Sequence, residues 1–201
     1  MSRATTALLD ADIHLADSVI AADAEIDARR AELDLMSFDL LARPQPVATD
    51  LRVIVTSMRM SSDIERMGDL ARHVAKVARL RYPASAVPAE LRATILQMGQ
   101  VAERIVEKAG SVIAARDVEA AHQIERDDDA MDDLHRELFA RVTDGNWQHG
   151  TEAAVDITLL GRYYERFADH AVSVGHRVIW LVTGDVDPAS EIVRDEVFGP
   201  V

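Results

Sequence analysis

A pair of carboxylates four residues apart occurs twice in this chain, in nearly the same local sequence. The first copy is Glu65-Arg66-Met67-Gly68-Asp69, and the second is Glu165-Arg166-Phe167-Ala168-Asp169, at an offset of 100 residues. On a helix, residues i and i+4 share a face with their Cβ atoms about 5–6 Å apart, and like charges at this spacing are mildly destabilising. Repetition of an unfavourable pair therefore indicates that a cation compensates it.

The repeat extends upstream of the motif. Residues 12–27 match residues 117–132 in their acidic and apolar positions, at an offset of 105 residues. Two copies indicate a duplicated bundle rather than a solenoid. Asp12 and Asp117 are predicted N-caps, because a carboxylate there accepts the free amide donors of a first helical turn. Apolar periodicity, interrupted by prolines and glycines, predicts helices over residues 2–10, 12–43, 47–81, 88–115, 117–144 and 151–183.

These elements predict an all-α protein made of two tandem, pseudo-symmetric three-helix bundles, with six helices of which the first is short. The first unit spans residues 1–83 and the second spans 88–184, while residues 185–201 form an acidic tail that we expect to be flexible. Because the first helix is about a third as long as its counterpart, we expect apolar side chains of the first unit to lack cover. That end should then self-associate or be poorly ordered.

Two apolar stripes at helical spacing are expected to form the core, with the carboxylate pairs at their edges. The first stripe is Val53, Ser57, Met60, Ile64, Met67, Ala71, Val74 and Ala78. The second stripe is Ala153, Ile157, Leu160, Tyr164, Phe167, Ala171, Val178 and Val182.

Antiparallel pairing within each unit places further acidic residues opposite the two pairs. A turn near residue 45 brings Asp23 and Asp27 towards the first pair, and a turn near residue 147 brings the acidic stretch 125–132 towards the second. Clusters made only of oxygen ligands suit Mg, Ca, Mn or iron. We therefore predict two metal sites, Glu65, Asp69, Asp23 and Asp27 in the first unit and Glu165, Asp169, Asp128 and Asp132 in the second.

A second interpretation of these acidic residues stays open. Acidic residues at helical spacing often form a solvated face, and Arg66 and Arg166 are placed to neutralise the aspartates three residues on. His73 lies one turn after the first motif and could add a nitrogen ligand, although Ser173 stands at the equivalent position. His170 points away from the second motif, so we expect it to be a surface residue.

Composition restricts the function further. The 201 residues are 48% hydrophobic but only 4% aromatic, which is typical of packed helices, and the absence of cysteine favours a reducing, cytoplasmic location. The net charge of −13 disfavours nucleic acid and favours cations or a basic protein partner. No apolar run approaches the ~18 residues of a membrane span. Neither a phosphate-binding loop nor a nucleophile motif is present, so we expect no enzymatic activity.

Three segments of this sequence resemble the PhoU family, with an actinobacterial character around residues 79–83. The segments are Arg43-Pro44-Gln45-Pro46-Val47-Ala48-Thr49-Asp50-Leu51-Arg52, Asp63-Ile64-Glu65-Arg66-Met67-Gly68-Asp69-Leu70-Ala71 and Tyr164-Glu165-Arg166-Phe167-Ala168-Asp169-His170-Ala171. The resemblance covers the chain from about Ala4 to Gly184. It departs from the family at the start, because PhoU proteins normally have a full first helix.

The resemblance implies tandem three-helix bundles and a cytosolic negative regulator of phosphate uptake and of the phosphate-starvation response. It implies an adaptor between the ATPase subunit of a phosphate ABC transporter and a membrane sensor histidine kinase, and we expect a homo-oligomer, most simply a dimer. In some members the E-x-x-x-D motifs bind metal clusters, so iron, zinc, Mg or Mn are the implied ions. The alternatives are a metal-storage bundle, a metal-dependent enzyme, or a helical scaffold with solvated acidic faces.

Overall fold

The structure, a computed structural model, describes residues 1–43 and 47–185, and over these residues every regular element is helical. The all-α prediction is confirmed, while the acidic tail lies outside the described residues apart from Asp185. A short 3-10 helix, η1 (Ala89–Leu91), precedes α4, so α4 begins later than predicted. The six α-helices are α1 (Ser2–Asp10), α2 (Ile13–Leu41), α3 (Ala48–Arg81), α4 (Arg92–Ala115), α5 (Val118–Thr143) and α6 (Gly150–Thr183).

One tight helix junction is used twice, as the sequence repeat predicts. Asp12 caps α2 by accepting a hydrogen bond from the amide of Leu15, and Asp117 caps α5 by accepting one from the amide of Ala120, both at 3.0 Å. The residue before each cap, Ala11 or Arg116, has a positive φ of 51° or 53°. Each junction therefore reverses the chain within two residues and aligns a long helix beside the preceding one.

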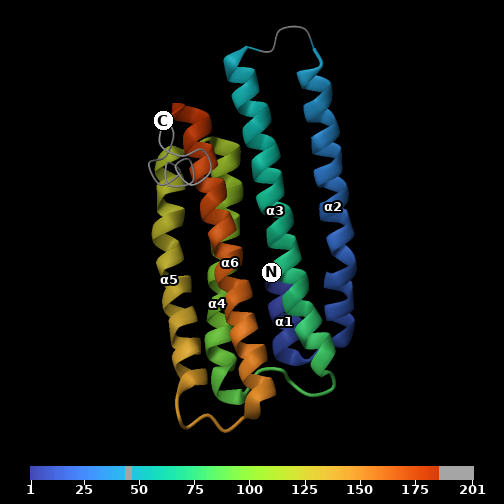
Figure 1. The fold of residues 1–201 in the computed structure, drawn as a ribbon, viewed down its shortest axis with the longest axis vertical. Helices are drawn as coiled ribbons and strands as arrows, with labels where there is room; N and C mark the ends of the chain where they lie inside the picture. The colour runs from blue at the N-terminus through green and yellow to red at the C-terminus, as the bar shows by residue number, and fades with distance from the viewer. Residues whose placement is uncertain (44–46, 186–201) are drawn as a thin grey trace, which may run out of the picture.

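The central helices α3 and α6 pack against each other and join the two units (Figure 1). They run antiparallel, as two ion pairs at opposite ends of the contact show. Asp63 on α3 accepts from Nε of Arg177 on α6 at 2.5 Å, and Arg81 on α3 donates through Nε to Asp156 on α6 at 2.5 Å. The outer helices complete the units, because α2 packs on α3, and α4 and α5 pack on α6.

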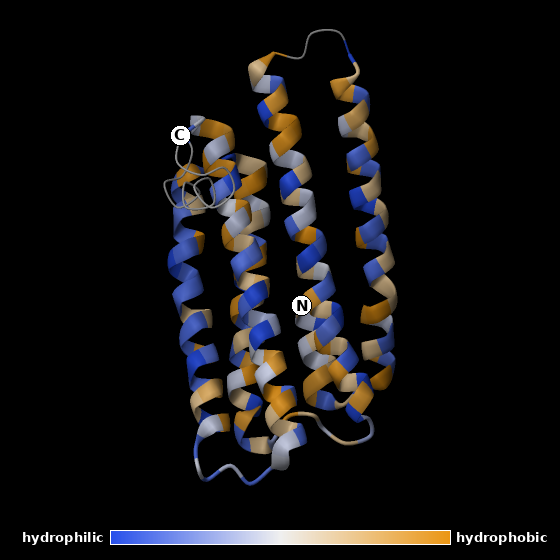
Figure 2. Ribbon diagram, in the orientation of Figure 1, coloured by the Kyte–Doolittle hydropathy of each residue, from blue (hydrophilic) through white to orange (hydrophobic). Residues whose placement is uncertain are grey.

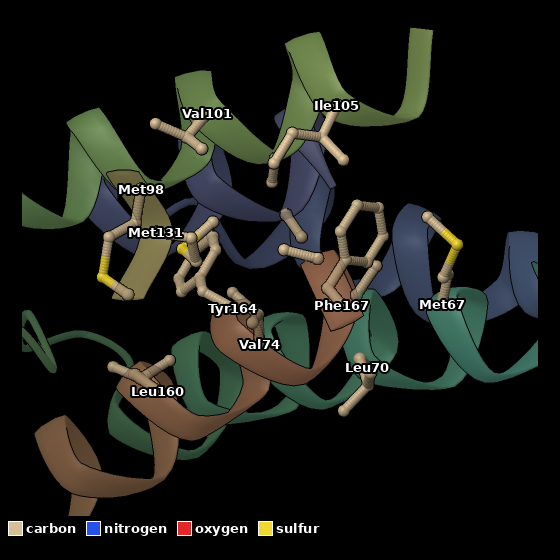
Figure 3. Packing of buried hydrophobic residues seen from close by; sticks show 14 of the residues in the cluster. Met67, Leu70, Val74, Met98, Val101, Ile105, Met131, Leu160, Tyr164 and Phe167 are labelled. Atoms are coloured by element: carbon tan, nitrogen blue, oxygen red, sulfur yellow. The ribbon is translucent and has the colours of Figure 1, made fainter. Parts of the chain in front are cut away.

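A continuous hydrophobic core runs through both units (Figure 3). Its largest fully buried side chain is Tyr164 on α6, whose hydroxyl lies 2.8 Å from the hydroxyl of Thr5 on α1. Close approach of α1 to α4 requires a glycine, because a Cβ on Gly99 would lie 2.6 Å from Thr5 Cγ2. The short α1 thus anchors the first unit to the second rather than covering its own unit along its length.

The two predicted stripes are not equally buried. In the second unit most of the stripe is buried and only Val182, in the last turn of α6, is exposed. In the first unit Ile64 is 43% exposed, whereas its equivalent Tyr164 is fully buried. Placing Ile64 and Val182 in the core was therefore wrong. The physical reason for Ile64 is that α4 and α1 cover the equivalent position of α6, whereas α1, although it packs on α3, reaches Ile64 only with its first residues.

The apolar side chains that we expected to lack cover lie towards the C-terminal end of α2 and the N-terminal end of α3. Both helices extend beyond α1 (Figure 1), and their ends carry several apolar residues (Figure 2). The lack of cover is confirmed, whereas self-association stays a prediction. The exposed apolar residues there are Leu35, Met36, Phe38, Leu40, Leu41, Val47, Leu51 and Val55, which we call the exposed apolar end.

Candidate functional site

The first acid patch consists of Asp23 on α2 and Glu65 and Asp69 on α3, as predicted from the hairpin register. The guanidinium of Arg72 bridges the two helices there, because it donates to Asp23 through Nη1 and to Asp69 through Nη2. Asp23 is only 6% exposed. Burial raises the pKa of Asp23, with Arg72 acting in the opposite direction. A buried carboxylate at this position therefore depends on the arginine that spans the hairpin.

Two further arginines neutralise the first acid patch. Nη1 of Arg30, on α2, lies 3.1 Å from Oε2 of Glu65, although the hydrogen-bond geometry of this buried oxygen is poor. Arg66 lies 3.1 Å from Asp69, which confirms the expected pairing three residues on. Each of the three carboxylates thus has at least one guanidinium partner.

Asp27, the fourth residue predicted for this site, lies outside that network. Its side chain is exposed. Its negative charge, one turn away on α2, helps to raise the pKa of Asp23. The structure therefore brings together three of the four predicted residues and leaves the fourth in solvent.

The second acid patch consists of Asp128 and Asp132 on α5 and Glu165 and Asp169 on α6. Burial raises the pKa of Asp128 to about 7, and the charges of Asp132, Asp169 and Glu165 add to the effect. Burial likewise raises the pKa of Glu165 and of Asp169. The four predicted residues therefore form one electrostatically coupled group in which the negative charges oppose one another, and Asp132, like its equivalent Asp27, is exposed.

Positive charge near the second acid patch comes from its rim. Arg162 pairs with Glu165 from the preceding turn of α6, and His135 on α5 stabilises the charged form of Glu165. Two carboxylate oxygens, Oδ1 of Asp128 and Oε2 of Glu165, are buried without a hydrogen-bond partner. Among the described residues, no guanidinium joins α5 to α6 in the way that Arg72 joins α2 to α3.

Sequence comparison within the chain explains this difference. Position 72 is arginine, but the equivalent position on α6 is Val172. Position 30 is also arginine, but the equivalent position on α5 is His135. The two copies keep the carboxylates and differ in the cations. The repeated acidic residues alone did not point to Arg72 and Arg30. The same internal alignment nevertheless shows that both arginines are replaced in the second copy.

A metal ion of the kind that the resemblance implies fits the two patches differently. The first acid patch does not fit, because its carboxylates already contact arginines. The second offers the right donors, because no guanidinium among the described residues joins its helices and Oδ1 of Asp128 is buried without a hydrogen-bond partner; Oε2 is unpartnered in Glu65 and Glu165 alike. Within the described part of the chain, no group of three or more His, Asp or Glu side chains has the arrangement needed to hold a metal ion. The metal sites stay predictions, with Asp128, Asp132, Glu165 and Asp169 as the residues that would hold a cation.

The histidines near the motifs have other partners. His73 stacks on Tyr163 with a ring separation of 5.2 Å, and burial lowers its pKa. His170 is not the surface residue that we expected, because its Nδ1 lies 3.2 Å from Asp63. It points away from the second acid patch, as predicted, but that face of α6 is the contact with α3. Both histidines therefore belong to the interface between the central helices.

Helical bundles in tandem, each with an acid patch between its second and third helices, define a class of duplicated helical bundle. A family model described as the PhoU domain matches residues 1–78 and 95–178. This chain belongs to the PhoU family, as the sequence resemblance indicated. None of its described helices has the length and apolar character needed to cross a membrane.

Named relatives and solved structures agree with this assignment. "Phosphate-specific transport system accessory protein PhoU homolog 2" of Mycobacterium tuberculosis is 52% identical over 92% of this chain and 86% of its own length. Homolog 1 of the same organism is 46% identical over 96% of this chain and 87% of its own. The crystal structure of the phosphate transport system regulatory protein PhoU from Streptococcus pneumoniae aligns with a TM-score of 0.82 and 26% identity, covering 92% of this chain and 87% of that one.

Proposed function

We propose that this protein is a non-enzymatic regulatory accessory protein of phosphate-specific transport. The observation that carries the proposal is the identity of about half of all residues, over nine-tenths of the chain, with relatives that bear this name. The same fold, in a protein named as a regulator of phosphate transport, supports it. The chain acts by binding other proteins in the cytoplasm, where it restrains phosphate uptake and the phosphate-starvation response.

Its partners are the ATPase subunit of the phosphate ABC transporter and a membrane sensor histidine kinase, which it links. The net charge of −13 suits docking onto basic surfaces. Attraction of this kind is screened over a Debye length of about 10 Å at 0.1 M salt, so binding should weaken as salt rises. The exposed apolar end supplies a second, salt-insensitive kind of contact surface.

The direct test is a pulldown from cell membranes with the purified, tagged protein at low and at high salt. We expect the transporter ATPase and the sensor kinase in the bound fraction, and less of both at high salt. Capture of the ATPase alone would remove the adaptor role, and capture of neither would contradict the proposal. Deletion of the gene should also derepress a phosphate-starvation reporter in phosphate-rich medium, and an unchanged reporter would contradict negative regulation.

Metal binding is a second candidate function, favoured by the unpartnered oxygens of Asp128 and Glu165. A cation bound there would supply the positive charge that the second acid patch lacks. Binding requires the four carboxylates to turn towards a common point. Metal analysis of protein purified without chelator tests this candidate, and the absence of bound metal after dialysis against iron, zinc, Mg or Mn would refute it.

A further inference from the structure

The first copy of the motif already contains its own counter-charges. Three carboxylates, Asp23, Glu65 and Asp69, contact three guanidinium groups, which belong to Arg30, Arg66 and Arg72. The formal charges of these six groups cancel. Arg72 has the central role, because its two terminal nitrogens reach carboxylates on different helices and its own side chain is mostly buried.

We propose that the first acid patch is closed to metal ions, and that Arg72 is the residue that closes it. A divalent cation held by Asp23 and Asp69 would lie beside the guanidinium that both carboxylates now contact. Two positive charges at such a separation repel strongly where water is partly excluded. Displacing Arg72 instead would leave its charge without a partner in a partly buried place.

The second copy shows what the same backbone looks like without this side chain. Val172 stands where Arg72 stands, and Oδ1 of Asp128 on the opposite helix is buried without a hydrogen-bond partner, whereas its equivalent Asp23 contacts Arg72. Arg30 is replaced by His135. The duplicated motif has therefore diverged into one cluster neutralised by arginines and one in which, among the described residues, no guanidinium joins the two helices.

Exchange of the two residues tests the proposal. Arg72→Val gives the first copy the residue of the second, and we expect it to bind one more Mn²⁺ ion per chain than the wild type does. Mn²⁺ is the probe because it prefers carboxylate ligands, and bound ions are counted by equilibrium dialysis with electron paramagnetic resonance. The matched control is Arg79→Val on the same helix, an exposed arginine paired with Asp17, which should leave the count unchanged.

Three further variants protect the test against a folding defect and examine its converse. Arg72→Gln removes the charge and leaves a polar side chain of intermediate length, and it should also gain an ion. Asp69→Asn in the wild-type background should not change the number of bound ions. Val172→Arg places an internal cation in the second acid patch, and any Mn²⁺ bound there should be lost.

The stability of the folded protein gives an independent measurement. Mn²⁺ should raise the melting temperature of Arg72→Val more than that of the wild type, because the ion replaces the missing guanidinium. Equal numbers of bound ions in the wild type and both Arg72 variants would overturn the proposal. Loss of an ion from the Asp69→Asn variant would overturn it as well. Neither result depends on whether the protein regulates phosphate transport.

Discussion

Position 72 carries an arginine that joins α2 to α3 by ion pairs, and the equivalent position on α6 carries Val172, which packs against the hydrophobic core. Around both positions the backbone, the helix caps and the acidic residues are repeated. In the first unit arginines contact the carboxylates, and Arg72 opposes the rise that burial causes in the pKa of Asp23, whereas in the second unit burial and mutual repulsion raise three carboxyl pKa values. Duplication thus preserved the acids while it allowed their counter-charges to change.

A second difference between the units concerns cover. Tyr164 is enclosed by α1 and α4, but its equivalent Ile64 faces solvent because α1 is short. The unit with less apolar cover is also the one whose acidic residues are paired across helices. The first unit therefore depends more on ion pairs for holding α2 against α3, and the second depends more on packing.

The largest effect is expected from truncating the equivalent residues Tyr164 and Ile64. Tyr164→Ala should lower the free energy of unfolding by about 3–5 kcal/mol, because it removes a fully buried ring. Ile64→Ala should cost about 1 kcal/mol or less, because the side chain is 43% exposed. Urea unfolding measures both values. Similar losses in the two variants would mean that α3 is covered as well as α6 is.

Opposite signs are expected from removing the buried aspartate of each acid patch in protein kept free of metal by a chelator. Asp23→Asn should lower the free energy of unfolding by ~1–3 kcal/mol, because Arg72 loses its charged partner. Asp128→Asn should raise it at pH 8, because the charge that it removes is buried among other carboxylates. Urea is the suitable denaturant, since a salt would screen the charges. Destabilisation of the same size in both variants would refute the contrast.

The second acid patch should also make stability depend on pH. Asp128 has a pKa of about 7 in the folded protein, above its ordinary value near 3.8. The folded state therefore holds a proton between these values that the unfolded state releases. The stabilisation is complete below pH 4, decreases as pH rises, and is lost above pH 7. The difference in melting temperature between wild type and Asp128→Asn, both with chelator, should follow this course, and a constant difference from pH 5 to pH 8 would contradict it.

Much of the fold could be predicted because its determinants are local. Asp12 and Asp117 mark helix starts through their own hydrogen bonds, and the apolar period fixes which face of each helix is buried. The hairpin register follows from the position of each turn, and it placed Asp23 and Asp128 opposite the correct motif. These features need no knowledge of how the two units meet.

The environments of His170 and Ile64 could not be predicted in this way, because they depend on how helices far apart in the sequence pack together. His170 is half-buried only because its face of α6 contacts α3, and nothing in one helix period identifies the partner. Ile64 is exposed because α1 is short and reaches this part of α3 only with its first residues. Arg72 could have been found, because it breaks the repeat at a position where the second copy has Val172. Departures from internal symmetry were thus more informative about the site than the repeated residues were.

The two helix caps should behave alike, in contrast to the acid patches. Asp12→Ala and Asp117→Ala each remove one hydrogen bond to the third following amide, at 3.0 Å in both units. Each substitution should lower the free energy of unfolding by ~1 kcal/mol. Urea unfolding of the two variants and of the double variant should give equal and additive effects. A cap that contributed in only one unit would show that the junctions have diverged as well.

The smallest effect on stability is expected at the exposed apolar end. Leu35→Ser with Phe38→Ser should change the free energy of unfolding by no more than ~0.5 kcal/mol, because these side chains are 67% and 60% exposed. Sedimentation velocity should nevertheless show less self-association, because an uncovered apolar patch favours contact with another chain. The matched control is Phe139→Ser with Val155→Ser in the second unit, where the residues are exposed to a similar degree but lie away from that end. If the control variant reduced self-association as much as the test variant, self-association could not be attributed to the exposed apolar end of the first unit.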